Sequence, residues 1–175
     1  ASTLAPGAAV VSRAQAATQV LGATPPATLF RPGELVSERY RIRRFIARGG
    51  MGEVYEAEDL ELRQQVALKT VHPRDATHEV AIERFKREIS LARKVTHANV
   101  CRIYDVGYHA RPDGTSVIFL TMELLEGETL SHRIRCQGTL SPEEALPIAR
   151  QMIAALAAAH AAGVIHRDFK SENVF

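Results

Sequence analysis

The chain is poor in cysteine, in aromatic residues and in net charge. Its 175 residues include two cysteines and no tryptophan, and 6% are aromatic. Cys101 and Cys136 form no Cys-x-x-Cys pair, so the sequence indicates neither a disulfide framework nor a zinc site. A formal net charge of +2 is too small to indicate nucleic acid or an anionic membrane surface as a partner.

Long apolar runs are also absent. The nearest candidate, Met152 to Ile165, is shorter than the roughly 20 residues of a transmembrane helix and contains His160. The chain begins with Ala and has no secretory signal, and its start and abrupt end suggest a fragment. We therefore expect a cytoplasmic segment without a membrane span, and leave open a membrane anchor beyond it.

The first part of the chain differs in composition from the rest. Residues 1 to about 33 are rich in Ala, Thr, Pro and Ser and show no sustained periodicity. Such a segment has too little apolar surface to offset its ordering entropy, so we expect a disordered leader over residues 1–37. A docking or phosphoacceptor tail, with Thr24 before Pro25, is the alternative interpretation.

From Tyr40 onward the pattern predicts strands. Their β-branched and aromatic content indicates five of them, at residues 40–46, 54–58, 65–71, 101–108 and 116–122. One helix is expected after the third strand, because the spacing of its apolar residues follows one helical face. These residues are Ile82, Phe85, Ile89 and Ala92.

The last third of the chain is helical in pattern. A short helix is expected at residues 128–137, and a longer one has clear signals at its start. Ser141 is the expected N-cap, with Pro142 at the first position and Glu144 three residues after the cap. Pro147 lacks a backbone N–H, so we expect a local kink or a loosened first turn there.

The stretch from Ile46 to Tyr55 is rich in glycine. Glycine lets the backbone approach a ligand closely and leaves N–H groups free for phosphate oxygens. Hairpin turns need glycine for the same conformational freedom. This stretch alone therefore leaves phosphate binding and a plain turn as open alternatives.

Lys69 interrupts an otherwise apolar strand. A lysine on the buried side of a strand needs an anionic partner, because an unpaired buried charge is costly. Glu88, at the edge of the expected helix's apolar face, is the candidate. Lys69 could instead reach along the surface into water, and Glu88 could be one of several solvated charges.

The loop from His166 to Asn173 collects polar groups suited to phosphate chemistry. Asp168 could orient a hydroxyl and accept its proton. The amide oxygen of Asn173 suits Mg²⁺, and Lys170 could neutralise a phosphoryl group in transfer. A charged surface turn is the alternative.

In this order, the glycine loop, the strand Lys, the helix Glu, the segment MELLEG and the loop HRDFKSEN resemble the eukaryotic-type protein kinase family. GGMGEVYEAED and HRDFKSENVF look most like bacterial Ser/Thr protein kinases, and the likeness runs from about Tyr40 to Phe175. It implies a protein-kinase-like α+β fold: a five-stranded antiparallel N-lobe with one inserted helix, then the start of a helical C-lobe. The implied boundaries are 38–126 for the N-lobe and hinge, and 127–175 for an incomplete C-lobe.

The resemblance implies an ATP site. Gly49 and Gly52 match the second and third glycines of G-x-G-x-x-G-x-V, whereas Ala47 replaces the first and would stiffen the loop or shift nucleotide affinity. Lys69, paired with Glu88, would contact the α- and β-phosphates. The implied nucleotide contacts are Ile46, Ala47, Gly49, Gly50, Gly52, Val54, Ala67, Lys69, Met122, Glu123 and Leu125.

The resemblance also implies catalytic roles. Asp168 would be the base, Lys170 a γ-phosphate contact and Asn173 a Mg²⁺ ligand, with Lys69 and Glu88 completing the set. Lys170 in HRDxK is similar to the Ser/Thr-specific branch. The implied function is ATP-dependent phosphorylation of Ser/Thr hydroxyls in a protein substrate; no oligomeric state is implied.

Two other functions stay open. One is a catalytically dead nucleotide-binding pseudokinase or scaffold, and the other is a small-molecule phosphotransferase of similar fold. The family's Asp-Phe-Gly motif and activation segment do not occur before Phe175. We therefore expect that these 175 residues alone do not transfer phosphate.

Overall fold

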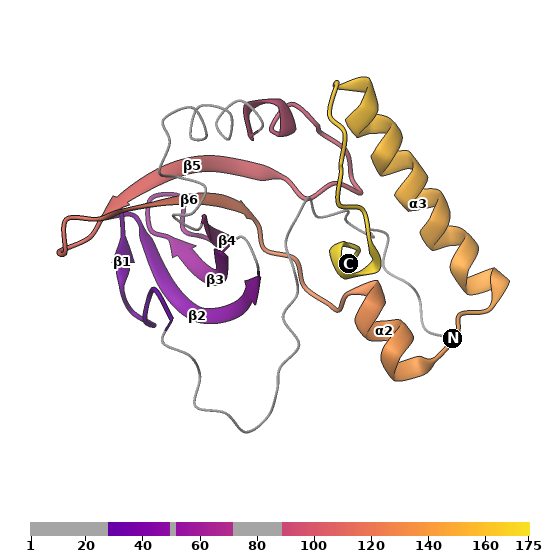
Figure 1. The fold of residues 1–175 in the computed structure, drawn as a ribbon, viewed down its shortest axis with the longest axis horizontal. Helices are drawn as coiled ribbons and strands as arrows, with labels where there is room; N and C mark the ends of the chain where they lie inside the picture. The colour runs from indigo at the N-terminus through magenta and orange to yellow at the C-terminus, as the bar shows by residue number, and fades with distance from the viewer. Residues whose placement is uncertain (1–27, 50–51, 72–88) are drawn as a thin grey trace. The chain divides into compact units, whose positions relative to one another are not determined.

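The computed structural model describes residues 28–49, 52–71 and 89–175. The chain divides into two compact units, shown in Figure 1. The sheet unit contains the described residues up to 90 together with residues 103–124. The helical unit contains residues 91–102 and 125–175.

The sheet unit is built on one antiparallel sheet of six strands, in the order β1-β2-β3-β4-β6-β5. Five of the strands confirm the predicted ones, with ends shifted by a few residues. The strands are β1 (Leu35–Val36), β2 (Tyr40–Gly49), β3 (Gly52–Asp59), β4 (Gln64–Val71), β5 (Ile103–Ala110) and β6 (Ser116–Glu123).

The sixth strand, β1, corrects the expected leader. Leu35 and Val36 pair with Arg41 and Tyr40, and both Phe30 and Val36 are 0% exposed. Composition suggested too little apolar surface for residues up to 37 to fold. These side chains are ordered nonetheless because the neighbouring sheet supplies the partners they bury against. Residues 1–27, including Thr24, lie outside the described residues.

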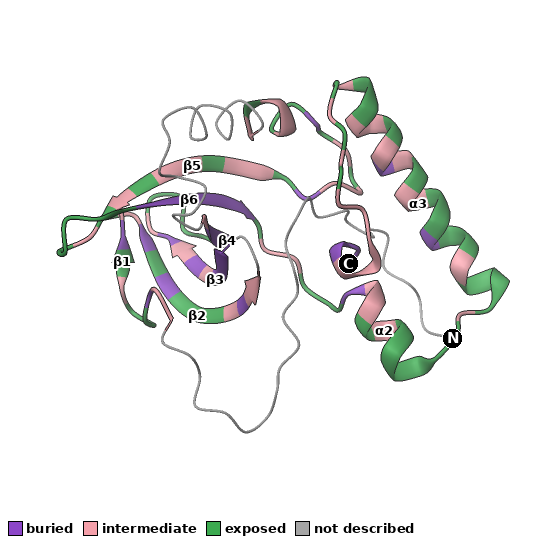
Figure 2. Ribbon diagram, in the orientation of Figure 1, coloured by how far each residue is buried: buried purple, intermediate pink, exposed green. Residues whose placement is uncertain are grey.

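The core cluster lies on one face of the sheet. The central strands β4 and β6 are buried along most of their length, as Figure 2 shows. Side chains alternate between the two faces along a strand, and directly paired residues share a face. The core cluster consists of Phe30, Val36, Tyr40, Ile42, Tyr55, Ala57, Val66, Leu68, Val117 and Phe119.

The two edges of the sheet meet at one point. Ser37, directly after β1, donates its N–H to Nδ1 of His109 at 3.0 Å and its hydroxyl to the carbonyl of Tyr108 at 2.7 Å. Tyr108 and His109 belong to β5, the strand at the other edge. The sheet is therefore curled enough for its first and last strands to touch, at the end where β5 finishes in Figure 1.

The helical unit contains α2 (Leu130–Gln137), α3 (Pro142–Ala161) and the short 3₁₀ helix η2 (Ser171–Asn173). The capping box predicted for α3 is confirmed. The Glu144 N–H donates to the Ser141 hydroxyl at 3.3 Å, and the Ser141 N–H donates to the Glu144 carboxylate at 3.0 Å. The helix then continues without interruption through Pro147.

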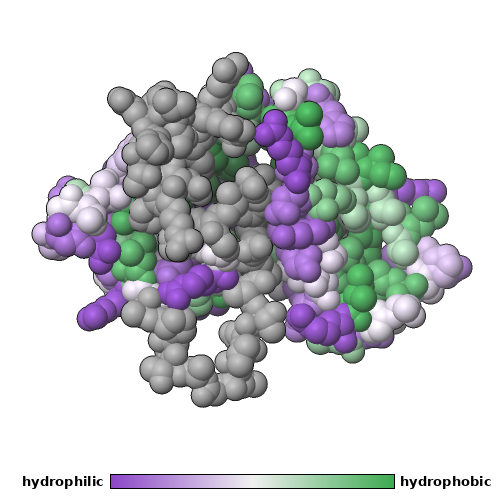
Figure 3. Space-filling model, viewed as in Figure 1, coloured by the Kyte–Doolittle hydropathy of each residue, from purple (hydrophilic) through white to green (hydrophobic). Residues whose placement is uncertain are grey.

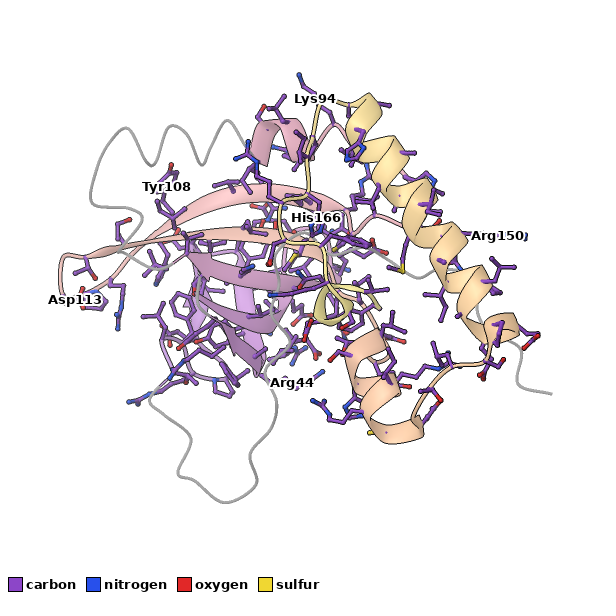
Figure 4. The ribbon with its side chains drawn as sticks, turned by 45° about the vertical axis from the view of Figure 1, so that its right-hand side comes forward. Arg44, Lys94, Tyr108, Asp113, Arg150 and His166 are labelled. Carbon is purple, nitrogen blue, oxygen red and sulfur yellow. The ribbon has the colours of Figure 1, made fainter. Side chains whose placement is uncertain are left out.

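Much of α3 is exposed. Its apolar residues Leu146 and Ile153 are 51% and 67% exposed, and Figure 3 shows apolar side chains gathered over this helix. Arg150 points away from α3 in Figure 4. None of the helices in the described ranges is long and apolar enough to cross a bilayer.

The predicted helix after the third strand is described only at its end. Residues 89–92 are helical and confirm that part. The rest of the predicted helix, with Ile82, Phe85 and Glu88, lies outside the described residues.

Candidate active site

The sheet face opposite the core carries the predicted nucleotide contacts of β2, β3, β4 and β6. Ala47 is paired with Val54, Val54 with Lys69, and Ala67 with Met122. Paired residues share a face, and so do alternate residues of one strand, so all five side chains lie on the same side. Each of the five is at most 8% exposed. The strand register thus brings together residues that span 76 positions of sequence, from 47 to 122.

Lys69 is held on this face by its neighbours in β4. Leu68 and Thr70, on either side of it, are 0% and 3% exposed and project toward the core. Lys69 itself is 8% exposed, so it lies in a poorly hydrated environment, where electrostatic interactions are stronger than in water. Glu88 lies outside the described residues, so the Lys69–Glu88 ion pair stays a prediction.

Two glycines flank the turn of the hairpin between β2 and β3. Gly49 pairs with Gly52 across the turn. Gly52 has a φ of 147°, and a Cβ there would stand 1.9 Å from the carbonyl oxygen of Thr70. Only glycine fits this position, which agrees with its predicted place in the loop. Gly50 lies outside the described residues.

Ala47 departs from the family pattern without strain. It is paired with Val54 inside β2 and is not one of the residues with positive φ. An L-residue is therefore accommodated where the pattern has its first glycine. Ile46 lies in the irregular part of β2 between Phe45 and Ala47 and is half-buried.

The remaining predicted nucleotide contacts lie at the end of the sheet unit. Glu123 closes β6 opposite Val66 and is exposed. Leu125 is the first residue of the helical unit after β6. Leu120 was not predicted as part of the site, but it pairs with Lys69 and is 7% exposed on the same face. Only the register reveals it, because an apolar residue in an apolar strand carries no signal of its own.

The loop after α3 brings Asp168, Lys170 and Asn173 together. The Lys170 ammonium lies 3.3 Å from Oδ1 of Asp168. The Asn173 side-chain NH₂ donates to the Asp168 carbonyl at 2.8 Å, and its nitrogen is 3.4 Å from Oδ2 of the same residue. The cluster predicted from the sequence is therefore present, with Asp168 at its centre.

The backbone of this loop is tightly turned at Asp168. The Asp168 N–H donates to the His166 carbonyl at 2.8 Å, and Arg167 between them has a φ of 60°. A γ-turn with positive φ at a residue that carries a Cβ is strained, and such strain is typical of functional sites. The His166 ring, labelled in Figure 4, packs edge-on against Phe169 with centroids 5.3 Å apart.

The Asn173 side chain fits a hard cation. Asn173 is 0% exposed, and its Oδ1 has no hydrogen-bond partner in the described part of the chain. Its two N–H contacts to Asp168 fix the amide orientation and leave that oxygen for another group. A buried carbonyl oxygen without a donor is costly, and Mg²⁺ prefers oxygen ligands of this kind.

The chain after the loop is tied back to the helical unit. The Leu130 N–H, in the first turn of α2, donates to the carbonyl of Val174 at 2.8 Å, and Val174 is 1% exposed. Asn99 donates its side-chain NH₂ to Gln151 of α3 at 2.8 Å. The first bond ties the end of the loop to α2, and the second ties Asn99 to α3 within the same unit.

Comparison with known proteins agrees with this geometry. A family model described as protein kinase domain matches residues 40–175. The probable serine/threonine-protein kinase pknA2 of Bifidobacterium longum is 40% identical over 146 residues, which cover 82% of this chain and 19% of that protein. PrkC of Bacillus subtilis, a serine/threonine-protein kinase, is 39% identical over 142 residues, which cover 81% of this chain and 21% of PrkC.

A solved structure supports the same fold. The PknI kinase domain of Mycobacterium tuberculosis superposes with a TM-score of 0.72 at 26% identity, covering 85% of this chain and 59% of that one. This chain spans about a fifth of the length of the curated relatives described above.

An antiparallel sheet with a buried lysine next to a glycine hairpin, and a loop that clusters Asp, Lys and Asn, are features of the protein kinase family. The match over residues 40–175 makes the assignment specific. The chain belongs to the protein kinase family, and its similarity is to bacterial Ser/Thr kinases.

Proposed function

We propose that the protein containing this chain is an ATP-dependent serine/threonine kinase that phosphorylates hydroxyl groups of protein substrates. The observation that carries the proposal is the contact of Asp168 with both Lys170 and Asn173 in the loop after α3. The names of the relatives, all serine/threonine-protein kinases, point the same way.

Asp168 is the proposed base. Its carboxylate would orient a substrate hydroxyl and accept the proton as the oxygen bonds to the γ-phosphorus. The bond from the γ-phosphorus to the bridging oxygen breaks in the same step, and ADP leaves. Lys170, already 3.3 Å from Asp168, would neutralise charge on the transferring group.

The nucleotide would bind against the sheet face that carries Val54, Ala67 and Met122. Their small or apolar side chains suit an adenine ring, and Lys69 would contact the α- and β-phosphates, paired with Glu88. Mg²⁺, when bound, neutralises phosphate charge, and Asn173 would hold it through Oδ1. The sequence placed the lobes at 38–126 and 127–175; we propose that the first lobe instead begins at about Phe30, which is buried in its core.

A cytoplasmic location for this segment is part of the proposal, because the reaction consumes ATP. The proposed protein substrate would present a Ser or Thr hydroxyl to Asp168.

The test is Asp168→Asn in the full-length protein. The Asn side chain keeps the size of Asp168 but cannot accept the proton, so phosphate transfer should fall about 10²- to 10⁴-fold. Affinity for a non-hydrolysable ATP analogue should remain within about twofold, because Asp168 does not bind the nucleotide. Transfer is measured with labelled ATP and affinity by titration calorimetry.

Asp113→Asn is the matched control. Asp113 lies in an exposed turn between β5 and β6, so its loss changes the charge equally without touching the loop. Nucleotide binding without transfer in the wild type, unchanged by Asp168→Asn, would favour the pseudokinase alternative instead.

A further inference from the structure

We propose that Glu53 is a positioning residue for the glycine hairpin, held from the core face of the sheet by the backbone of Leu29 and by Tyr55. The inference rests on the proposed nucleotide site but concerns residues on the opposite face of the sheet. It assigns a role to the chain segment just before β1.

Glu53 is a buried carboxylate with a full set of partners. It is 6% exposed. Its Oε1 accepts from Arg48 Nε at 2.8 Å and also from the Arg48 terminal nitrogen. Its Oε2 accepts the Leu29 N–H at 2.8 Å and the Tyr55 hydroxyl.

These partners keep Glu53 ionised. Burial alone would raise the pKa of Glu53, but the bonds from Tyr55, Leu29 and Arg48 outweigh it and hold the pKa below its usual value. A charge buried in this way is stable only while its partners stay in place, because removal of one leaves the charge under-compensated. The position of Glu53 therefore depends on Tyr55, Leu29 and Arg48 together.

The network joins both arms of the glycine hairpin. Arg48 on β2 and Glu53 on β3 are directly paired, one step before the Gly49–Gly52 pair at the turn. The Glu53 N–H also donates to the Thr70 hydroxyl at 2.9 Å, which links the outgoing arm to β4 beside Lys69. Movement of Glu53 would therefore displace both arms of the hairpin. It would also disturb the bond between the hairpin and β4, the strand that carries Lys69.

Phe30 anchors the segment that supplies the Leu29 N–H. Its side chain is 0% exposed and lies 5.5 Å from the rings of Tyr55 and His109. The Phe30 N–H donates to the Tyr55 hydroxyl at 3.0 Å, and the Thr28 hydroxyl donates to the Phe30 carbonyl at 2.9 Å. Tyr55 thus connects the anchored segment to Glu53 through one hydroxyl group.

The side chains of Glu53 and Tyr55 lie on the face opposite the proposed nucleotide contacts. Glu53 and Tyr55 alternate with Val54 along β3, so their side chains lie on the core side while Val54 lies with Lys69. Glu53 would act on the nucleotide only through the hairpin backbone. This distinguishes a positioning role from a binding role.

Asp59 on the same strand provides a matched control. It is 2% exposed, lies on the same face as Glu53, and accepts two bonds from Arg39, at 2.7 and 3.0 Å. It is six residues from Glu53, so about 20 Å farther from the hairpin along the strand. Both carboxylates stabilise the sheet, but Glu53 is paired with Arg48 beside the turn, whereas Asp59 is paired with Tyr40 at the far end of the same two strands.

The test compares Glu53→Gln, Tyr55→Phe and Asp59→Asn in the full-length protein. We expect Glu53→Gln and Tyr55→Phe to raise the KM for ATP about tenfold and to speed amide exchange of a peptide spanning the hairpin. We expect Asp59→Asn to lower the Tm about as much as Glu53→Gln does. Its KM for ATP and its rate of hairpin amide exchange should stay at wild-type values. Glu53→Asp, which keeps the charge but shortens its reach, should be intermediate in KM.

The outcomes separate the inference from the proposed function. Equal hairpin exchange and equal KM in all three variants, with only the Tm lowered, would show that the network is purely structural and would overturn the inference. Faster hairpin exchange in the Glu53 and Tyr55 variants supports the inference even if the wild type binds no ATP. That last result would contradict the proposed function alone.

Discussion

The sheet unit and the helical unit are stabilised in different ways. The sheet unit has a continuous core in which Tyr55, Leu68 and Phe119 are at most 1% exposed. In the described helical unit, α2 buries no residue and α3 buries only Ile148 and Ala155. Its order comes instead from caps and from bonds such as that between Leu130 and Val174.

This contrast agrees with the function proposed for each unit, nucleotide binding for the sheet unit and phosphate transfer for the helical unit. The nucleotide face of the sheet is shaped by strand register, and register is well specified where the other face is buried. The Asp168 loop is shaped by local hydrogen bonds and a strained γ-turn, which need directional contacts more than buried area. Stability should therefore respond to core substitutions in one unit and to polar substitutions in the other.

The largest expected effect is on the core of the sheet unit. Phe119→Ala should lower the free energy of unfolding by about 3–5 kcal/mol, because it leaves a cavity among Tyr40, Leu68 and Val117. The matched change Ile153→Ala, at a residue 67% exposed in α3, should shift it by less than about 0.5 kcal/mol. Denaturant unfolding followed separately by probes in each unit measures both. An equal loss in the two variants would contradict the contrast.

A smaller effect is expected at the start of α3. Ser141→Ala removes the hydroxyl that accepts the Glu144 N–H, and should cost about 1 kcal/mol. Ser141→Asp keeps an acceptor at the helix N-terminus and should restore most of that loss. Thermal unfolding of the wild type and the two variants is the measurement. Failure of the Asp variant to recover stability would mean that the cap is not what holds this end of the helix.

The smallest expected effect is a pH dependence in the sheet unit. The hydrogen bonds from Arg39 lower the pKa of Asp59 below its ordinary value of 3.8, against the opposing effect of burial. Its stabilisation is therefore complete above about pH 5 and is lost as the pH falls below 3.8 and through the lower folded pKa. The stability difference between wild type and Asp59→Asn should be constant near neutrality and shrink in acid. A difference that stays the same down to pH 2 would rule out this linkage.

The sequence predicted the elements well because their signals are local. Alternation marked the strands, and Ser141 with Glu144 marked the start of α3. The proximity of Asp168, Lys170 and Asn173 could also be expected from the sequence, since the three residues lie within six positions of one another. These features depend on residues close together in the sequence, so a sequence pattern can reveal them.

What escaped prediction depends on distant partners. Phe30 is buried because Tyr55 and His109 surround it, and nothing near Phe30 in the sequence indicates them. Glu53 is one of four acidic residues in β3, so its residue type does not set it apart, and its partners come from three different segments. Likewise, only register places Leu120 with Lys69.

The contact of Ser37 with β5 also bears on association between molecules. An open sheet edge offers unpaired N–H and C=O groups to a strand of another chain, and proteins protect such edges against aggregation. Here one edge strand, β1, is only two residues long. The hydroxyl of Ser37 donates a hydrogen bond to the carbonyl of Tyr108 in β5, the strand at the opposite edge. The curl of the sheet thus leaves less backbone available for a second copy to extend it. Ser37→Gly, which removes that hydroxyl, should make the protein more prone to self-association through β5.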